Sequence, residues 1–127
     1  ERYTMCHNVL IVEDDLALQQ MLAWELEDLG YQVTATGNCQ SGRTLFEARS
    51  FDLVLLDYNL PDGDGVNLLD ELRRNRPGLP VIVFSGAGCQ ETPERALRSG
   101  ATHFVVKPAS TALLDRLFKE VLRVTSG

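Results

Sequence analysis

The segment Phe51-Asp-Leu-Val-Leu-Leu-Asp57-Tyr-Asn-Leu-Pro-Asp-Gly63 joins an apolar run to an acid and then to a turn. A continuous apolar run of this length is typical of a central parallel strand that is covered on both faces. Asp57 therefore stands at the end of a predicted buried strand. Because a buried charge is costly without a partner, we expect this acid to lie at a surface cleft and to serve a purpose.

Three other predicted strands also end in polar residues. Val9–Val12 precedes Glu13, Asp14 and Asp15, Val81–Phe84 precedes Ser85 and Gly86, and Phe104–Val106 precedes Lys107 and Pro108. The carboxyl ends of parallel strands meet at one edge of the sheet, which is where open α/β sheets bind ligands. Acids, a hydroxyl and an ammonium are therefore expected to gather at that edge.

Strand and helix patterns alternate along the whole chain. The predicted strands cover residues 9–12, 31–36, 53–56, 81–84 and 102–106. The predicted helices run up to Gly30, from 38 to 49, from 64 to 75, from Thr92 to Gly100, and onward from Ser110. Five consecutive βα units predict an α/β domain, with one parallel sheet and helices on both of its faces.

Composition narrows the class of protein. The chain has 127 residues, 44% of them hydrophobic, which suits a single domain with a substantial core. A net charge of −6 argues against direct binding of nucleic acid, and we interpret the basic cluster Arg73-Arg74-Asn-Arg76 as a solvated helix end. No apolar stretch approaches the ~20 residues of a membrane span, and the first residues lack a signal-peptide pattern. We therefore expect a cytoplasmic protein that does not bind membranes, with three reduced cysteines.

The expected cluster of charges suggests its own chemistry. Glu13, Asp14 and Asp57 would repel one another, so Lys107 and a divalent cation are the natural counter-charges. Oxygen ligands favour a hard ion such as Mg²⁺. A carboxylate beside Mg²⁺ can attack phosphorus and form an aspartyl phosphate. Ser85 and Lys107 would then bind the phosphoryl oxygens.

With these signatures, the chain resembles a receiver domain of a two-component response regulator, from about His7 to Val124. The resemblance implies a flavodoxin-like, doubly wound (βα)5 fold with the strand order 2-1-3-4-5. It divides the chain into an N-terminal extension at 1–6, the receiver domain at 7–124, and a tail or the start of a linker at 125–127.

The resemblance also implies the roles of individual residues. Asp57 resembles the phosphoacceptor, and Glu13 and Asp14 resemble the acidic pair, so that Asp15 falls at the helix start as an N-cap. Mg²⁺ or Mn²⁺ would be held by Asp14, by Asp57 and by the backbone carbonyl of Asn59, with Glu13 in the same acidic site.

The remaining implied positions concern the conformational response. Ser85 resembles the switch hydroxyl, Lys107 the invariant lysine and Phe104 the aromatic switch, while Pro108 stands where the family has a cis peptide bond. Two mild departures from the family are Glu at position 13 in place of Asp, and Phe at position 104 in place of Tyr.

Two functions fit these features. The favoured one is a signalling switch, not an enzyme in the ordinary sense, which assists its own phosphorylation and dephosphorylation. Its partners would be a sensor histidine kinase or a histidine phosphotransfer protein. The sequence does not decide whether an output domain follows residue 127 or whether the domain forms a homodimer. The alternative is a phosphatase of the haloacid dehalogenase type. Asn59 disfavours that alternative, because the phosphatases use an aspartate there as a general acid, and their acidic pair comes late in the chain.

Overall fold

The computed structural model describes residues 7–86 and 92–126 of the chain. Its elements follow one another as β1 (Asn8–Val12), α1 (Leu16–Asp28), β2 (Gln32–Thr36), α2 (Cys39–Ala48), β3 (Leu53–Asp57), β4 (Asn59–Leu60), β5 (Gly63–Asp64), α3 (Gly65–Asn75), β6 (Val81–Ser85), α4 (Pro93–Arg98), β7 (His103–Val106) and α5 (Thr111–Ser126). The predicted alternation of strands and helices is thus confirmed.

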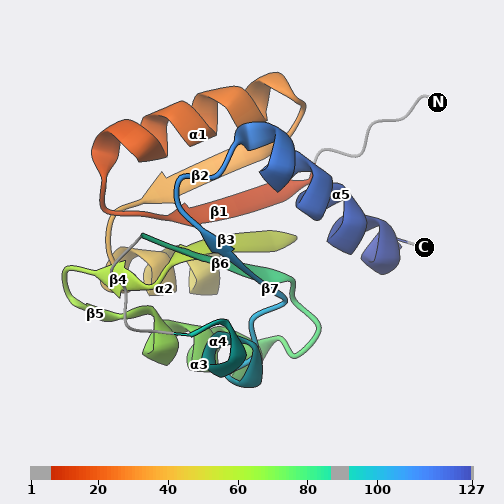
Figure 1. The fold of residues 1–127 in the computed structure, drawn as a ribbon. Coiled ribbons are helices and arrows are strands. Elements are labelled where there is room, and N and C mark those ends of the chain that lie inside the picture. The colour runs from red at the N-terminus through yellow and green to blue at the C-terminus, as the bar shows by residue number, and fades with distance from the viewer. Residues whose placement is uncertain (1–6, 87–91, 127) are drawn as a thin grey trace.

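Five strands form one parallel sheet in the order β2-β1-β3-β6-β7. The register places Val12 beside Leu56 and Asp57 beside Phe84, so β1, β3 and β6 end at nearly the same level. Helices α1 and α5 cover one face of the sheet, and α2, α3 and α4 cover the other (Figure 1). This arrangement is the doubly wound, flavodoxin-like α/β fold that we expected.

The strand count differs from the expectation. The short strands β4 and β5 pair antiparallel in a separate two-stranded sheet. Numbered along the chain, the main sheet therefore has the order 2-1-3-6-7 and not 2-1-3-4-5. Strands of two residues on either side of a Pro61-Asp62 turn are too short to carry an alternating pattern, which is why the sequence did not predict them.

Each face of the sheet has its own apolar core. On the α1 and α5 side, Leu22, Leu26, Leu114 and Phe118 pack against alternate residues of the central strands. The opposite core contains the other alternate residues, including Leu10, Val12, Val54, Leu56, Val81 and Val83, with Leu68, Leu69 and Leu72 from α3. The central strand β3 is buried along its whole length, as its continuous apolar run predicted.

The helix ends follow from local signals. Asp15 caps α1 by accepting a hydrogen bond from the backbone N–H of Leu18, and Thr92 caps α4 in the same way. Gly30 and Gly100 follow α1 and α4 with φ angles of 105° and 114°, which favour glycine.

Some element boundaries differ from the predicted ones. Strand β2 begins at Gln32, α3 begins at Gly65, and α5 extends to Ser126, into the segment where we expected a tail or linker. Residues 1–6, expected to be an extension, lie outside the described part of the chain. Of the helices in the described ranges, none is both long enough and apolar enough to cross a bilayer.

Candidate functional site

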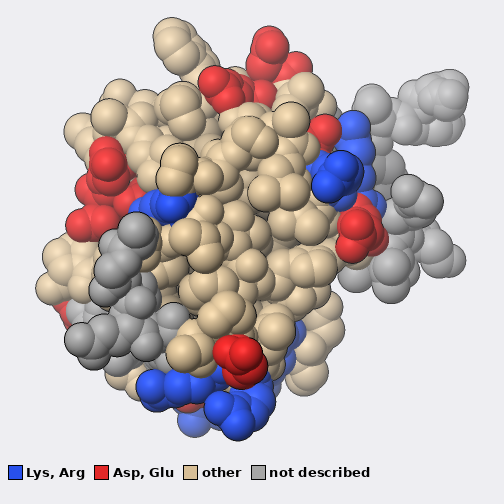
Figure 2. Space-filling model, viewed as in Figure 1, with Lys and Arg blue, Asp and Glu red and all other residues tan. Residues whose placement is uncertain are grey.

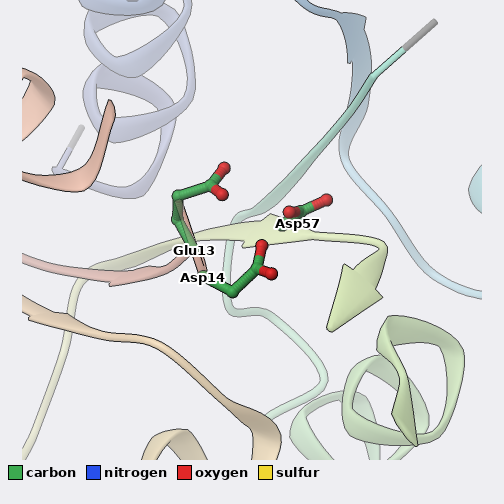
Figure 3. A group of neighbouring side chains, drawn as sticks. All are labelled: Glu13, Asp14 and Asp57. Carbon is green, nitrogen blue, oxygen red and sulfur yellow. The ribbon is translucent and has the colours of Figure 1, made fainter. Parts of the chain in front are cut away.

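Three acids meet at the carboxyl edge of the sheet. Glu13 and Asp14 directly follow β1, and Asp57 is the last residue of the neighbouring strand β3. Each offers one carboxylate oxygen, and these oxygens lie within 4.8 Å of one another. Figure 3 shows the carboxylates of Asp14 and Asp57 facing the space beyond the ends of the two strands. The edge thus concentrates negative charge, as the sequence predicted.

Lys107 neutralises part of this charge. Its Nζ lies 2.6 Å from Oε1 of Glu13 and 3.2 Å from Oδ2 of Asp57. The other oxygen of Glu13, Oε2, accepts a hydrogen bond from the backbone N–H of Asp15 at 2.8 Å. Both oxygens of Glu13 are therefore engaged within the protein. The Glu13 side chain is fully buried and that of Asp57 nearly so.

These contacts shift the proton affinities at the site. Burial raises the pKa of the Glu13 carboxyl, and the hydrogen bond from Lys107 offsets this effect only in part. Burial alone would lower the pKa of Lys107, but the hydrogen bond to Glu13 and the charge of Asp57 outweigh it, so this pKa is raised. Lys107 therefore carries a positive charge at neutral pH and can attract an anion.

Ser85 ends β6 beside this group. It is buried, and its Oγ is a buried polar atom that lacks a hydrogen-bond partner within the described ranges. Its backbone carbonyl accepts a hydrogen bond of 2.8 Å from the N–H of Lys107, which ties the ends of β6 and β7 together. An unsatisfied buried hydroxyl is costly. A ligand oxygen that bound at this edge could accept a hydrogen bond from the Ser85 hydroxyl and so remove that cost.

The segment after β3 folds back on Asp57. The backbone N–H of Asn59 donates a hydrogen bond of 3.1 Å to Oδ1 of Asp57, and Leu60 is buried in the core on the α3 side. The Lys107–Pro108 peptide bond is cis, at the position where the resemblance implied one. Phe104 is half-buried and packs against the same core as Leu60.

The donor set fits a hard divalent cation. Asp14 is exposed and Asp57 lies beside it, so both offer carboxylate oxygens, which Mg²⁺ prefers. Glu13 is less suited to direct coordination, because Lys107 and the Asp15 N–H already occupy its oxygens. The structure thus separates the acidic pair into a buried member, Glu13, and an exposed member, Asp14.

Two residues that hydrogen-bond to the segments around the site were not predicted from the sequence. The Nε2 of Gln19 in α1 donates a hydrogen bond of 2.8 Å to the backbone carbonyl of Glu13. Asp62, at the turn between β4 and β5, accepts hydrogen bonds from the backbone of Cys39 and Gln40 in α2. Neither contact could be predicted, because a polar residue in a first helical turn or in a loop has many potential partners.

The surface near the site includes exposed apolar side chains on α1. Helix α1 starts next to the acidic pair, and its exposed face includes three large apolar side chains: Leu16, Met21 and Trp24. Trp24 is 79% exposed. In Figure 2, acidic side chains gather at the left of the molecule, the side on which β1 ends and α1 begins, while basic side chains gather below, over α3 and α4.

Known proteins share this architecture. The chain is 34% identical to the response regulator protein FleR of Pseudomonas aeruginosa and 36% identical to the KDP operon transcriptional regulatory protein KdpE of Escherichia coli. These alignments cover 97% and 91% of the chain, but only 26% and 51% of the respective relatives. The structure matches a CheY-like receiver domain protein from Methanospirillum hungatei JF-1 with a TM-score of 0.90, at 31% identity, over 96% of this chain and 98% of that one.

The family assignment rests on most of the chain. A family profile described as the response regulator receiver domain matches residues 9–119, which include both ends of the site, from Glu13 to Lys107. The chain therefore belongs to the response regulator receiver domain family, a family of signalling domains.

Proposed function

We propose that Asp57 accepts a phosphoryl group from a phosphohistidine of a partner kinase or phosphotransfer protein, and that the altered surface is read by an output domain or target. The observation that carries this proposal is the environment of Asp57. Its carboxylate accepts a hydrogen bond from the ammonium of Lys107 and lies near the exposed acid Asp14, and the buried hydroxyl of Ser85 stands at the end of the neighbouring strand β6. Acceptor, counter-charge and hydrogen-bond donor thus converge on one edge of the sheet.

The transfer step is a substitution at phosphorus. An oxygen of Asp57 forms the new P–O bond, while the P–N bond to the donor histidine breaks and its electron pair returns to the imidazole. Lys107 neutralises phosphoryl oxygens by charge, and Ser85 can donate a hydrogen bond to one of them. Asp14, Asp57 and the carbonyl of Asn59 are the groups we assign to Mg²⁺, which when bound would offset negative charge on the phosphoryl oxygens. Glu13 serves to hold Lys107 in place.

The conformational response would start at Ser85. A phosphoryl group adds about two negative charges and three acceptor oxygens next to a hydroxyl that otherwise lacks a partner. Rotation of this hydroxyl toward the phosphoryl group would free space at the sheet edge for Phe104, which is half-buried on β7. Phe104 has no hydroxyl to desolvate on further burial, so little polar cost opposes this movement. The packing change would reach the β7 edge of the sheet, where α4 packs against β7 on one face and α5 follows β7 on the other.

The rival function is turnover of small phosphoesters by a phosphatase. Asn59 argues against it, because an amide two residues after the nucleophile cannot act as a general acid. Its backbone N–H instead donates to Asp57. We therefore favour a domain that is phosphorylated once per cycle and assists its own phosphorylation and dephosphorylation. The cytoplasmic location stays a prediction from the sequence.

The partner would dock beside the site, on α1. Leu16, Met21 and Trp24 are large apolar side chains exposed on the helix that begins next to the acidic pair, and Met21 and Trp24 line the same surface hollow. Contiguous exposed apolar surface marks interaction sites. Trp24→Ala should slow phosphoryl transfer from a phosphohistidine protein and leave labelling by a small-molecule donor unchanged. Equal transfer rates for wild type and variant would place the docking surface elsewhere.

The proposal is tested by incubating the domain with Mg²⁺ and acetyl phosphate and measuring its intact mass. Wild type should gain one phosphoryl group, and Asp57→Asn should gain none, because the amide is not a nucleophile. In parallel, excess phosphomonoester should give no sustained release of phosphate. Steady release that Asp57→Asn abolishes would favour the phosphatase instead.

A further inference from the structure

The hairpin that follows the acceptor strand is tied to the start of α2 by one side chain. Oδ1 of Asp62 accepts a hydrogen bond from the N–H of Cys39 at 2.8 Å, and Oδ2 accepts one from the N–H of Gln40 at 3.0 Å. These are the first two residues of α2, more than twenty positions earlier in the sequence. Asp62 thus connects two segments that the chain order does not bring together.

The contact completes the N-terminus of α2. The first turn of a helix leaves backbone N–H groups without partners inside the helix. Asn38, the N-cap, accepts a hydrogen bond from the N–H of Ser41 at 2.8 Å, and Asp62 takes the two N–H groups before it. These two hydrogen bonds lower the pKa of Asp62, so the carboxylate is ionised at neutral pH and interacts favourably with the helix dipole.

The contact between Asp62 and α2 also restrains the β4–β5 hairpin, which contains Asn59, the residue that bonds to Asp57. Asp62 and Pro61 form the two-residue turn of the β4–β5 hairpin, in which Asn59 pairs with Asp64 and Leu60 with Gly63. Leu60 is buried on the α3 side of the sheet, and the N–H of Asn59 bonds to Asp57. The hairpin is therefore held at its base by Asp57 and Leu60, and at its tip by α2.

We propose that Asp62 is a positioning residue for the divalent cation site: it anchors the hairpin tip to α2 and so holds the backbone carbonyl of Asn59 in place for the metal. This inference rests on the metal site assigned under the proposed function. It does not require that Asp57 be phosphorylated. Groups that orient metal ligands typically contribute about 10-fold or more to metal affinity, so loss of this contact should weaken binding measurably.

The test compares Mg²⁺ dissociation constants of three variants with wild type by isothermal titration calorimetry, and follows the Asn59 amide by NMR. Asp62→Ala should raise the dissociation constant about 10-fold, and Asp62→Asn, which keeps one acceptor oxygen, should raise it less. The control is Asp52→Ala. The Asp52 carboxylate also accepts a backbone hydrogen bond, from Asn8 at 2.7 Å, but at the opposite edge of the sheet. Asp52→Ala should lower stability and leave Mg²⁺ affinity unchanged.

A kinetic readout separates positioning from general destabilisation. With acetyl phosphate as donor, Asp62→Ala should need more Mg²⁺ for the half-maximal labelling rate but reach the wild-type rate at saturating Mg²⁺. Equal dissociation constants for Asp62→Ala and wild type, or no Mg²⁺ binding by wild type, would overturn the inference. If Mg²⁺ affinity depends on Asp62 while wild type accepts no phosphoryl group, the inference stands and the proposed function is wrong.

Discussion

Replacement of Lys107 by methionine removes the only lysine that contacts both buried acids among the ion pairs of the described residues. The methionine keeps an apolar chain of similar length and deletes the charge. Glu13, which is fully buried, and Asp57, which is nearly so, would then face each other without their ammonium. Breaking a buried ion pair from one side is costly, because the remaining charge stays desolvated.

The size of the effect follows from the distances. With an effective dielectric constant of about 20, Coulomb's law gives roughly 6 kcal/mol for the contact with Glu13 at 2.6 Å and roughly 5 kcal/mol for that with Asp57 at 3.2 Å. Removal of Lys107 also removes the cost of desolvating its own ammonium. Measured losses for broken buried pairs are about 3–5 kcal/mol, and the 19% exposure of the Lys107 side chain favours about 3 kcal/mol.

Urea and thermal unfolding at neutral pH without Mg²⁺ would measure this loss. For a domain of this length, about 3 kcal/mol corresponds to a fall in Tm of about 10 °C. The matched control is Lys119→Met, because Lys119 pairs with Asp115 at 3.0 Å on the surface with 69% of its side chain exposed. That variant should lose less than about 0.5 kcal/mol.

Mg²⁺ gives a second readout of the same variant. A divalent cation would neutralise the acids that Lys107 leaves behind, so it should stabilise Lys107→Met more than wild type. If Lys107→Met unfolds at the same urea concentration as Lys119→Met, the ammonium does not offset the charge of the acidic site, and this reasoning is refuted.

Three further predictions address other parts of the structure. Asp14→Ala should abolish the Mg²⁺-induced rise in Tm, whereas Asp15→Ala, which removes the α1 cap, should keep it; a rise that persists in Asp14→Ala would contradict the metal assignment. The bidentate hydrogen bond from Arg43 lowers the pKa of Glu71 below its ordinary 4.5, so this pair stabilises the fold above that pH and loses its effect as the pH falls through the lowered pKa. Glu71→Gln should therefore cost about 0.5 kcal/mol in urea unfolding at neutral pH and nothing once wild-type Glu71 is protonated; a constant difference at all pH values would refute this explanation. Ser85→Ala should still be phosphorylated but should show smaller NMR shift changes around Phe104 when a phosphoryl mimic is added, and identical changes in the two proteins would disprove the coupling.

The main sheet and the charged edge could be predicted because both depend on local sequence signals. Apolar runs as short as Leu53–Leu56 are typical of strands that are covered on both faces, and each of these runs ends at a polar residue. Once the strands are parallel, the placement of Glu13, Asp57 and Lys107 at one edge follows from topology alone.

The parts of the structure that the sequence did not predict depend on contacts between distant segments or on very short strands. The β4–β5 hairpin has only two residues in each strand, and its anchor at Asp62 uses backbone N–H groups of α2 that carry no side-chain signal. The outward face of α1 was also missed. The sequence predicted a helix ending at Gly30, but it did not predict that Trp24 would be exposed on that helix.

The most direct measurement would identify which carboxylate carries the phosphoryl group. After incubation with acetyl phosphate and Mg²⁺, borohydride reduction converts an acyl phosphate of aspartate to homoserine, which peptide mass spectrometry can locate. We predict homoserine at position 57 alone, and none without the phosphoryl donor. Homoserine at position 14, or phosphoryl incorporation that leaves Asp57 unmodified, would contradict the assignment of Asp57 as the acceptor.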